Sequence, residues 1–586
     1  MKKAILLLAL LCPLSSLAAN APVLFFSDLT NAPNSGGETV SGFSGAYVTL
    51  YGNFLGSSPG TSTVTWNGKN CLRVLSGTGN YTGWGMTWLW YQMIKVQLGS
   101  GCTAGSGNFV VTVGGQASDG IPFTVNAGSI LFVATTGSDS NNGSFSSPWK
   151  TIPHAVQTAG TGAGNIIYLE NGVSATVDDG QWNGAVSLKH GWCNGTATQM
   201  DGLVGYPGAM AQIGPNSVAT NGLVSSDFTA TGGACEGHWT IAGGIIFRGL
   251  NPMGLAGGDV WRIIGNDISD PLTSGSNGGS ACFETSQATN ARVLGNNFHD
   301  MNLASTDRLQ QGVYFSTDSN HAELGWNVLN NAKGRATLQI HSSPLVNGTG
   351  FAMFDIKIHD NIIHGANEEC IIVDTVDPSQ GGVSVYNNLV YDCGRDGSGS
   401  SLYRAVSSDF DTSHGDGSGN IDWFHNTVYC DGGAECFSSS FEVHTGQSLT
   451  DRVRNNLFYS TGASHPYWNI GNSQGGGQCS PSNSVSQCPN FVGSNNLVFG
   501  DGPPTFTSIL TNSINQNPQF VNLGSDFHLQ SSSPAVGAGA TGAPIPIGDL
   551  DGITRPTPPS IGAYEVAGGV VVNKPNPPTN LTIVVQ

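Results

Sequence analysis

At 586 residues, the chain is too long for one compact hydrophobic core, and it predicts two or three domains. Charged residues make up only 10% of it and glycine is abundant, which favours short strands and tight turns over surface helices. The formal net charge of -19 argues against nucleic acid and anionic membranes as partners. It also means that an acidic polysaccharide would need Ca²⁺ or a local basic cluster in order to bind.

The N-terminus has the pattern of a bacterial-type export signal peptide over residues 1–20. Lys2 and Lys3 precede the apolar run Ala4–Leu11, and small residues follow near Ala18. We therefore expect cleavage in this region and a secreted product, either extracellular or periplasmic. No later apolar stretch is long enough to cross a bilayer, so the sequence predicts no membrane span.

Cysteine usage agrees with export, because disulfides persist in oxidising compartments. Of the 12 cysteines, Cys12 lies in the signal and Cys282 is left over, and we expect Cys282 to be buried as a small apolar residue. The others suggest five pairs, which are Cys71 with Cys102, Cys193 with Cys235, Cys370 with Cys393, Cys430 with Cys436, and Cys479 with Cys488. No pair has the spacing of a zinc site.

Residues 22–126 predict a small β-sandwich, because apolar runs such as 47–51 and 109–113 alternate with glycine-rich turns. The stretches AYVTLYGNFLG, STVTWNG and NFVVTVGGQASDGIPFTV resemble the IPT/TIG immunoglobulin-like domain, which commonly acts as a spacer or binding module. Trp84, Trp88 and Trp90 stand close together here, followed by Tyr91. We favour a place in the sandwich core and at a strand edge for them, and the alternative is an aromatic platform for sugar rings.

The next segment, 129–175, predicts a cap for a stack of strands. Residues 151–159 have the apolar spacing of a helix that could cover the open end of such a stack. From about residue 238 a repeat appears at intervals of 27 to 40 residues, in strings such as IIGNDI, VLGNNF and IHDNII. Its aligned asparagines are Asn266, Asn296, Asn327, Asn361, Asn388, Asn426, Asn456 and Asn496. A β-rich repeat of this length predicts a solenoid, in which each asparagine tolerates left-handed geometry at a corner and bonds neighbouring backbone.

The cap-like start VATTGSDSNNGSFSSPWKTIPHAV and the end DFHLQSSSPAVGAGA, DLDGITRPTPPSIGAYE resemble the right-handed parallel β-helix superfamily that includes pectate-lyase-like proteins. The resemblance covers residues 129–566 and leaves 567–586 as a linker or tail. It implies an all-β fold class, an N-terminal Ig-like β-sandwich followed by a right-handed single-stranded parallel β-helix. The superfamily includes lyases, hydrolases, epimerases and non-enzymes, so the fold alone assigns no activity.

One sheet of the coils is expected to carry the chemistry. Its predicted strands are 281–286, 312–318, 336–342, 369–375 and 403–409. Period-two alternation turns one set of side chains inward, namely Val313, Phe315, Leu338, Ile340, Ile371 and Val373. The other set faces outward, namely Tyr314, Ser316, Thr337, Gln339, His341, Ile372 and Asp374. With strands about 4.8 Å apart, Glu284, Ser316 or Asp318, His341, Asp374 and Asp409 are expected to form a polar ladder.

Ionisable groups concentrate at this ladder in a chain that has few of them, which marks a candidate active site. A solvated face with ordinary ion pairs is the competing interpretation. As catalytic residues we expect His341, Lys333 and Arg335, any of which could serve as the base of a β-elimination. Substrate-binding candidates are Glu284, Tyr314, Gln339 and Arg404, and Asp374 and Asp409 are the candidate calcium ligands.

The sequence therefore predicts a secreted protein that binds a polysaccharide or cell-surface glycan and cleaves it by β-elimination. A glycoside hydrolase is the first alternative, with a carboxylate pair drawn from Glu284, Asp374 and Asp409. The second is a non-catalytic glycan-binding or adhesin-type protein, favoured by the negative charge and by the lack of an aligned catalytic signature. A further acidic group, Asp411, His414 and Asp416, is more simply interpreted as a surface loop than as a calcium site.

Overall fold

The structure is a computed structural model of the whole chain. It describes residues 20–75, 83–217, 219–225, 235–270, 281–303, 310–342, 352–395, 404–409, 417–431, 435–440, 448–461, 468–471, 491–500, 510–542 and 544–566. The predicted signal peptide, the group at 411–416 and the C-terminal tail lie outside these residues.

The N-terminal part is a sandwich of two mostly antiparallel sheets, as predicted. One sheet has the order β1-β3-β7-β5 with β6 on β7, and the other has the order β2-β10-β8-β4 with β9 on β8. The strands are β1 (Val23–Ser27), β2 (Asn31–Ala32), β3 (Tyr47–Asn53), β4 (Thr63–Trp66), β5 (Leu72–Val74), β6 (Trp84–Trp88), β7 (Tyr91–Leu98), β8 (Gly105–Val113), β9 (Gln116–Ala117) and β10 (Ile121–Val125). Trp66, Ile94 and Phe109 fill the space between the sheets. The finer likeness to an IPT/TIG domain stays a prediction.

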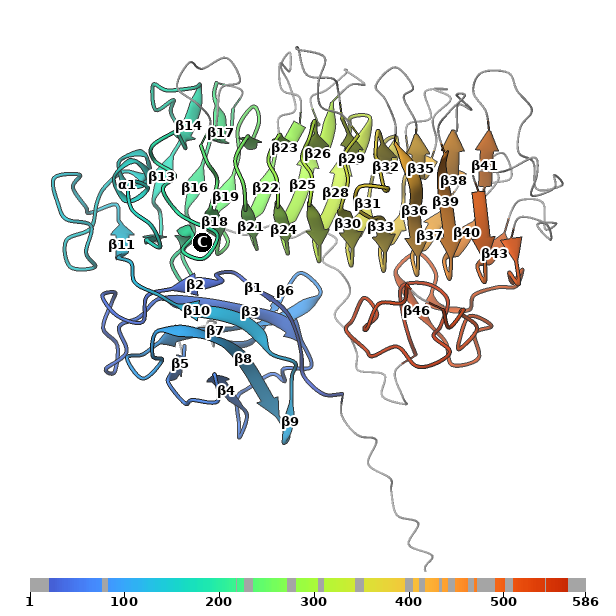
Figure 1. Cartoon of the computed structure of the whole chain (residues 1–586), viewed down its shortest axis with the longest axis horizontal. Coiled ribbons are helices and arrows are strands. Elements are labelled where there is room, and N and C mark those ends of the chain that lie inside the picture. The colour runs from blue at the N-terminus through green and yellow to red at the C-terminus, as the bar shows by residue number, and fades with distance from the viewer. Residues whose placement is uncertain are drawn as a thin grey trace, which may run out of the picture.

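Three long parallel sheets follow and wind into a right-handed parallel β-helix (Figure 1). Each is named here by its first strand. The β11 sheet contains β11 (Ile130–Val133), β12 (Ile166–Leu169), β15 (Asp201–Gly205), β18 (Trp239–Ala242), β21 (Arg262–Ile264), β24 (Arg292–Leu294), β27 (Glu323–Gly325), β30 (Ile356–His359), β33 (Val383–Tyr386), β36 (Ser418–Phe424), β39 (Ser448–Arg454), β42 (Phe491–Ser494) and β44 (Leu510–Thr511).

The other two sheets continue each coil in turn. The β13 sheet contains β13 (Ser174–Ala175), β16 (Gln212–Ile213), β19 (Ile246–Phe247), β22 (Asp267–Ser269), β25 (Asn297–Met301), β28 (Val328–Ala332), β31 (Ile362–His364), β34 (Leu389–Tyr391), β37 (Thr427–Cys430), β40 (Leu457–Ser460) and β43 (Leu497–Gly500). The β14 sheet contains β14 (Gly184–Ser187), β17 (Asn221–Val224), β20 (Met253–Ala256), β23 (Ala281–Ser286), β26 (Gln311–Ser316), β29 (Ala336–His341), β32 (Glu369–Asp374), β35 (Arg404–Asp409), β38 (Glu435–Ser440) and β41 (Trp468–Gly471).

The predicted cap is present as helix α1 (Ile152–Ala159). Thr151 is its N-cap, and its side chain accepts a hydrogen bond from the backbone N–H of His154. Ile152, Ala155 and Val156 face the first coils, so the helix covers the apolar end of the stack. This helix is far too short to cross a bilayer, and no other helix long and apolar enough to do so occurs in the described part of the chain.

The predicted asparagines form one continuous buried ladder between the β11 and β13 sheets. From Asn266 to Asn456, as in Asn327, the side-chain amide donates hydrogen bonds to Oδ1 of the next asparagine and to a carbonyl of the preceding coil. The expected left-handed geometry lies one residue earlier, at positions such as Gly295, Trp326 and Asp360. The asparagines therefore hold the corners by hydrogen bonding, while the residue before each of them supplies the positive φ.

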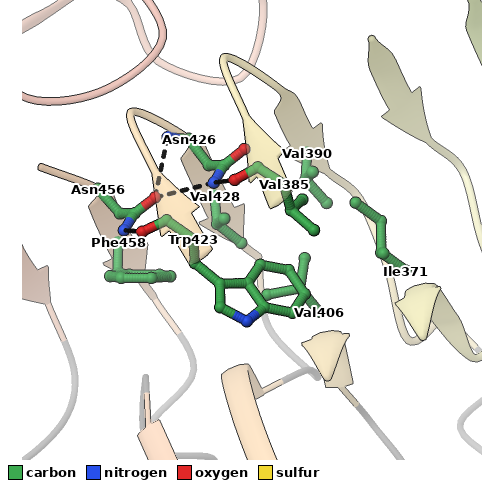
Figure 2. A pocket seen from close by; sticks show the side chains of 9 residues that line it. All are labelled: Ile371, Val385, Val390, Val406, Trp423, Asn426, Val428, Asn456 and Phe458. Atoms are coloured by element: carbon green, nitrogen blue, oxygen red, sulfur yellow. Dashed lines mark hydrogen bonds between the residues drawn. The ribbon is translucent and has the colours of Figure 1, made fainter. Parts of the chain in front are cut away.

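The interior of the coils is closely packed and apolar. Figure 2 shows one level of it, where Trp423 and Phe458 pack with several valines beneath the amides of Asn426 and Asn456. The space between these side chains is too small to admit a water molecule. Figure 2 therefore depicts core and ladder, and the ligand-binding surface must be sought on the outside of the coils.

Four of the five predicted disulfides are formed, Cys71–Cys102, Cys193–Cys235, Cys370–Cys393 and Cys430–Cys436. The fifth predicted pair is Cys479 with Cys488. Both Cys479 and Cys488 lie outside the described residues, so this disulfide is not confirmed and stays a prediction. Cys282 is buried and free, as expected. Disulfides are typical of proteins that fold in an oxidising compartment, so the four that are formed agree with export.

The last strand of the coils is β44, whereas the β-helix domain was predicted to extend to residue 566. The segment after β44 folds back along the outside of the stack and carries β45 (Phe520–Asn522) and β46 (Asp526–Leu529). It lies along the same side as the N-terminal sandwich (Figure 1). A buried ion pair between Arg555 and Glu565, 2.7 Å apart, holds the segment together, and a hydrogen bond of 2.8 Å from Arg555 to Asn387 joins it to the coils.

The aromatic run in the sandwich lies at this junction. Trp84 belongs to the sandwich core, whereas Trp90 and Tyr91 pack with coil residues and with the C-terminal segment. Trp88 donates its indole N–H to the Gly295 carbonyl at 2.7 Å, and Tyr91 donates to the Trp326 carbonyl at 3.0 Å. Their contacts are therefore core and interdomain contacts, and the sugar-platform interpretation is not supported.

Candidate functional site

The five strands predicted to carry the chemistry are present as β23, β26, β29, β32 and β35, in this order within the β14 sheet. Val313 pairs with Leu338, and Leu338 with Ile371, and all three side chains lie in the core. The alternate residues consequently point to the outside of the coil, as period-two alternation predicts.

Outward-pointing residues form two neighbouring columns in place of the single predicted ladder. In the first column, Ser316 pairs with His341, and Asp374 pairs with Asp409. Because Ile340 pairs with Val373, the residues that follow them, His341 and Asp374, also stand side by side. The second column lies two residues earlier along the strands and contains Glu284, Tyr314, Gln339 and Ile372. Glu284 therefore belongs beside Tyr314 and not in line with His341.

Three side chains from adjacent coils make a continuous polar contact. The phenol Oη of Tyr314 lies 2.9 Å from Nδ1 of His341. On the other side of the imidazole, Nε2 lies 3.8 Å from Oδ2 of Asp374, whose Oδ1 accepts a hydrogen bond of 2.9 Å from Thr375. Phenol, imidazole and carboxylate thus stand in a row across β26, β29 and β32, and this row is suited to moving a proton.

Electrostatics keep the phenol protonated at rest. Burial raises the pKa of Tyr314, and the negative charges of Glu284 and Asp374 raise it further. A side-chain hydrogen bond with Ser316 and the positive charge of Arg335 act in the opposite direction. Tyr314 therefore needs a nearby proton acceptor in order to ionise, and His341 is in contact with it.

The backbone beside Asp374 is strained. Thr375 has a φ of 52°, which is unfavourable for a β-branched residue. Thr317, which follows Ser316 on the neighbouring β26, also has a positive φ, of 22°. Such strain concentrates at functional sites, where the surrounding fold holds it in place.

The basic candidates lie toward the other end of the strands. Lys333 and Arg335 precede β29 and Arg404 begins β35, whereas His341 ends β29, about 17 Å along the strand from its first residue. The ammonium of Lys333 donates to the Leu303 carbonyl at 3.1 Å on an exposed turn. Of these groups, Arg335 is the one whose charge acts on Tyr314.

Several outward side chains are more buried than an open sheet face predicts. Gln339 is 2% exposed and Ile372 is fully buried, whereas the His341 side chain keeps 17% of its surface exposed. Within the described residues, Oε1 of Gln339 has no hydrogen-bond partner. The accessible part of this face is thus concentrated around His341 and the half-buried Tyr314 and Glu284.

The described residues contain no group of three or more His, Cys, Asp or Glu side chains placed to hold a metal ion. Of the two candidate calcium ligands, Asp374 contacts Thr375 and faces His341, and only the backbone of Asp409 is described. The described side-chain oxygens do not by themselves form a calcium site, and calcium binding stays a prediction.

Two further charged histidines lie on the other sheets, and the sequence analysis missed them. His299 lies between Asp267 and Asp300, and His359 lies between Glu323 and Asp360, with contacts of 2.7 to 3.2 Å. The repeated His-Asp dipeptide in FHD and IHD was a signal that could have found them. Their acidic partners raise the pKa of each imidazole to about 9, which suits a permanent ion pair better than proton transfer at neutral pH.

Comparison with known proteins adds no closer identification. No family model matches the chain, and no curated protein matches it. Among solved structures it is similar to pectate lyase Pel9A (14% identity, 75% of this chain and 96% of that one, TM-score 0.40) and to a rhamnogalacturonan lyase (12%, 67% and 91%, 0.40). It is also similar to XylC in complex with xylose (9%, 67% and 87%, 0.37). Values this low assign no activity to this chain.

Proposed function

We propose that the protein binds an acidic polysaccharide along the outer face of the β14 sheet and cleaves it by β-elimination. The observation that carries the proposal is the 2.9 Å contact between Tyr314 and His341, with Asp374 on the far side of the imidazole. These three residues stand on adjacent parallel strands, so the row runs along the stack, in the direction in which a polymer can lie across several coils.

The proposed chemistry uses Tyr314 as the group that faces the sugar. Its phenol proton passes to Nδ1 of His341, and the phenolate then removes the proton on the carbon next to the sugar's carboxyl group. A carbon–carbon double bond forms as the bond to the glycosidic oxygen breaks, and the phenol gives its proton to that leaving oxygen. His341 finally returns the stored proton to Tyr314, so the protein is unchanged at the end of the cycle.

Asp374 and Arg335 have supporting roles in this scheme. The carboxylate of Asp374, 3.8 Å from Nε2, stabilises the positive charge that His341 carries while it holds the proton. Arg335 is the cation suited to neutralise the sugar carboxylate, because its charge already acts on Tyr314. Glu284, half-buried and beside Tyr314, then belongs to the wall of the sugar site, whereas Gln339 is 2% exposed and Arg404 lies at the other end of its strand.

The geometry does not support the Glu284–Asp374 pair as the two carboxyl groups of a hydrolase. Glu284 and Asp374 stand on strands three spacings apart and are offset by two residues along the strand, so their Cα atoms are separated by about 16 Å. Glycosidases hold their two carboxyl groups about 5 to 9.5 Å apart. β-Elimination needs a base that removes the proton next to the sugar carboxyl group, and the phenol–imidazole pair is suited to that step.

The test is incubation of the purified protein with polygalacturonate, alginate, hyaluronan, xylan and galactan. Ultraviolet absorbance of unsaturated products together with new reducing ends on an acidic polymer is the expected result. Reducing ends without absorbance would establish the hydrolase alternative, and binding without either would establish a non-catalytic glycan-binding protein. Repeating the assay with EGTA and then with added Ca²⁺ tests the calcium prediction separately.

A further inference from the structure

A lysine lies between two tryptophans at the far end of the same sheet. The ammonium of Lys189 is 5.8 Å from the ring centre of Trp182 and 5.2 Å from that of Trp192, and it donates to Gln181 at 2.6 Å. Lys189 and both indoles are only half-buried. Exposed indole faces bind the apolar faces of sugars, and an ammonium between them can pair with a sugar carboxylate.

The backbone near each of the two tryptophans is anchored to the coils. On the Trp182 side, Asp179 accepts hydrogen bonds from the backbone N–H of Ser187 at 2.7 Å and from its hydroxyl at 3.0 Å, which closes the preceding loop onto β14. On the Trp192 side, the next residue forms the Cys193–Cys235 disulfide. The carboxylate of Asp179 is therefore already engaged, and so is that of the neighbouring Glu236, which pairs with His190.

Strand register connects this cluster to the proposed active site. Ser187 pairs with Val224, and the column continues through Gly254 and Glu284 to Tyr314. Four strand spacings separate Ser187 from Tyr314, which is about 19 Å. Trp182 precedes β14 and Lys189 follows it, so their contact lies beside the first strand of this column.

Gly254, in the same column, has room for a side chain. A Cβ atom built at this position would have no atom within 4 Å, and its φ does not demand glycine. A large side chain at this position would therefore obstruct a glycan chain lying along the column, without straining the backbone. Gly382, beside the β11 sheet, has the same open surroundings and offers a matched control position.

We propose that Trp182, Lys189 and Trp192 form a remote binding site for an acidic sugar unit of the polysaccharide whose cleavage point lies at Tyr314. The inference rests on the proposed function, since it needs one glycan chain to reach both places. In a chain with a net charge of -19, Lys189 supplies a local positive charge where an anionic polymer would otherwise be repelled.

The experiment measures binding by His341→Ala protein, which cannot consume its ligand, to polygalacturonate and to digalacturonate by calorimetry, with alginate polymer and dimer as a second pair. Trp182→Ala, Trp192→Ala and Lys189→Met are each expected to weaken polymer binding roughly 3- to 10-fold and leave dimer binding at Tyr314 unchanged. Lys189→Arg is expected to keep polymer binding. Gly254→Phe is expected to reduce the advantage of polymer over dimer, whereas Gly382→Phe is not.

The remaining results decide separately about the remote site and about the lyase proposal. If the three variants bind polymer as well as the parent does, the cluster is a structural cation–π contact. If they weaken dimer and polymer equally, it is not a remote site. Should wild-type protein cleave nothing while the tryptophan variants still lose polymer binding selectively, the lyase proposal fails and the binding site stands.

Discussion

The phenol of Tyr314 and the imidazole of His341 meet at 2.9 Å across two adjacent coils, with their rings nearly parallel at 25°. The contact exists because Tyr314 lies two residues before Ser316, the register partner of His341, on the same outward face. In the proposed mechanism, this contact lets Tyr314 and His341 exchange a proton, and substitution of either residue tests that role.

Removing the phenol oxygen should abolish this transfer. Tyr314→Phe and His341→Ala are expected to lower kcat by roughly 10²- to 10⁴-fold with little change in KM, because each deletes one member of the proton path. The measurement is the rate of ultraviolet absorbance gain on the acidic polymer that wild type cleaves. Ser384→Ala, on the outer face of the β11 sheet, is the control and should retain the full rate. A Tyr314→Phe protein with the wild-type rate would remove this residue from the mechanism.

Arg335 and Lys333 should differ, although they are neighbours in sequence. Arg335→Ala is expected to impair turnover and substrate binding, since its charge acts at Tyr314. Lys333→Ala is expected to have a much smaller effect, because its ammonium is held by the Leu303 carbonyl on an exposed turn. Parallel kcat and KM values for the two variants check this. The reverse order of effects would place the cation function on Lys333, as the sequence analysis also allowed.

Stability should fall at alkaline pH through His359. Burial lowers the pKa of this imidazole, but hydrogen bonds to Asp360 and Glu323 raise it from 6.5 to about 9. A raised pKa contributes stability that is fully present below pH 6.5 and is lost as pH rises through 9. The pKa of its partner Glu323 is shifted in the opposite direction, from 4.5 to about 2. The contribution of Glu323 to stability is therefore lost only as the pH falls through 2.

The measurement is the thermal midpoint between pH 5 and 10 for wild type and His359→Gln. The variant should be less stable at pH 6 and should lose part of the alkaline decline. His321→Gln, which removes a more exposed pair with Asp355, is the control. Parallel curves for wild type and His359→Gln would contradict the assignment.

The asparagine ladder should be a principal source of stability. Asn361→Ala removes bonds to Asn388 and to the Leu324 carbonyl, and it leaves the backbone and amide of Asn327 without their acceptor. We expect a loss of about 1–3 kcal/mol per unsatisfied buried group. Urea unfolding followed by fluorescence checks this, with Asn330→Ala on the outer face as the control. Equal stability of both variants would show that the ladder is dispensable.

The sequence determined the repeat and almost everything that follows locally from it. The spacing of Asn266, Asn296 and the later asparagines predicted the coils, because a residue that recurs at one corner bonds its equivalent in the next coil. Alternation correctly sorted Val313 and Phe315 inward. Cysteine spacing identified the four described disulfides, since cysteines close in sequence are often brought together by neighbouring strands or coils.

What the sequence could not provide is the register between coils and the placement of segments outside them. A shift of two residues decides whether Glu284 stands beside His341 or beside Tyr314, and unequal loop lengths hide that shift. Likewise, only the folded chain brings Trp182 and Trp192 to the two sides of Lys189, and places Trp88 against Gly295. Contacts between distant residues depend on how whole coils and domains pack, and this information is not contained in any local pattern.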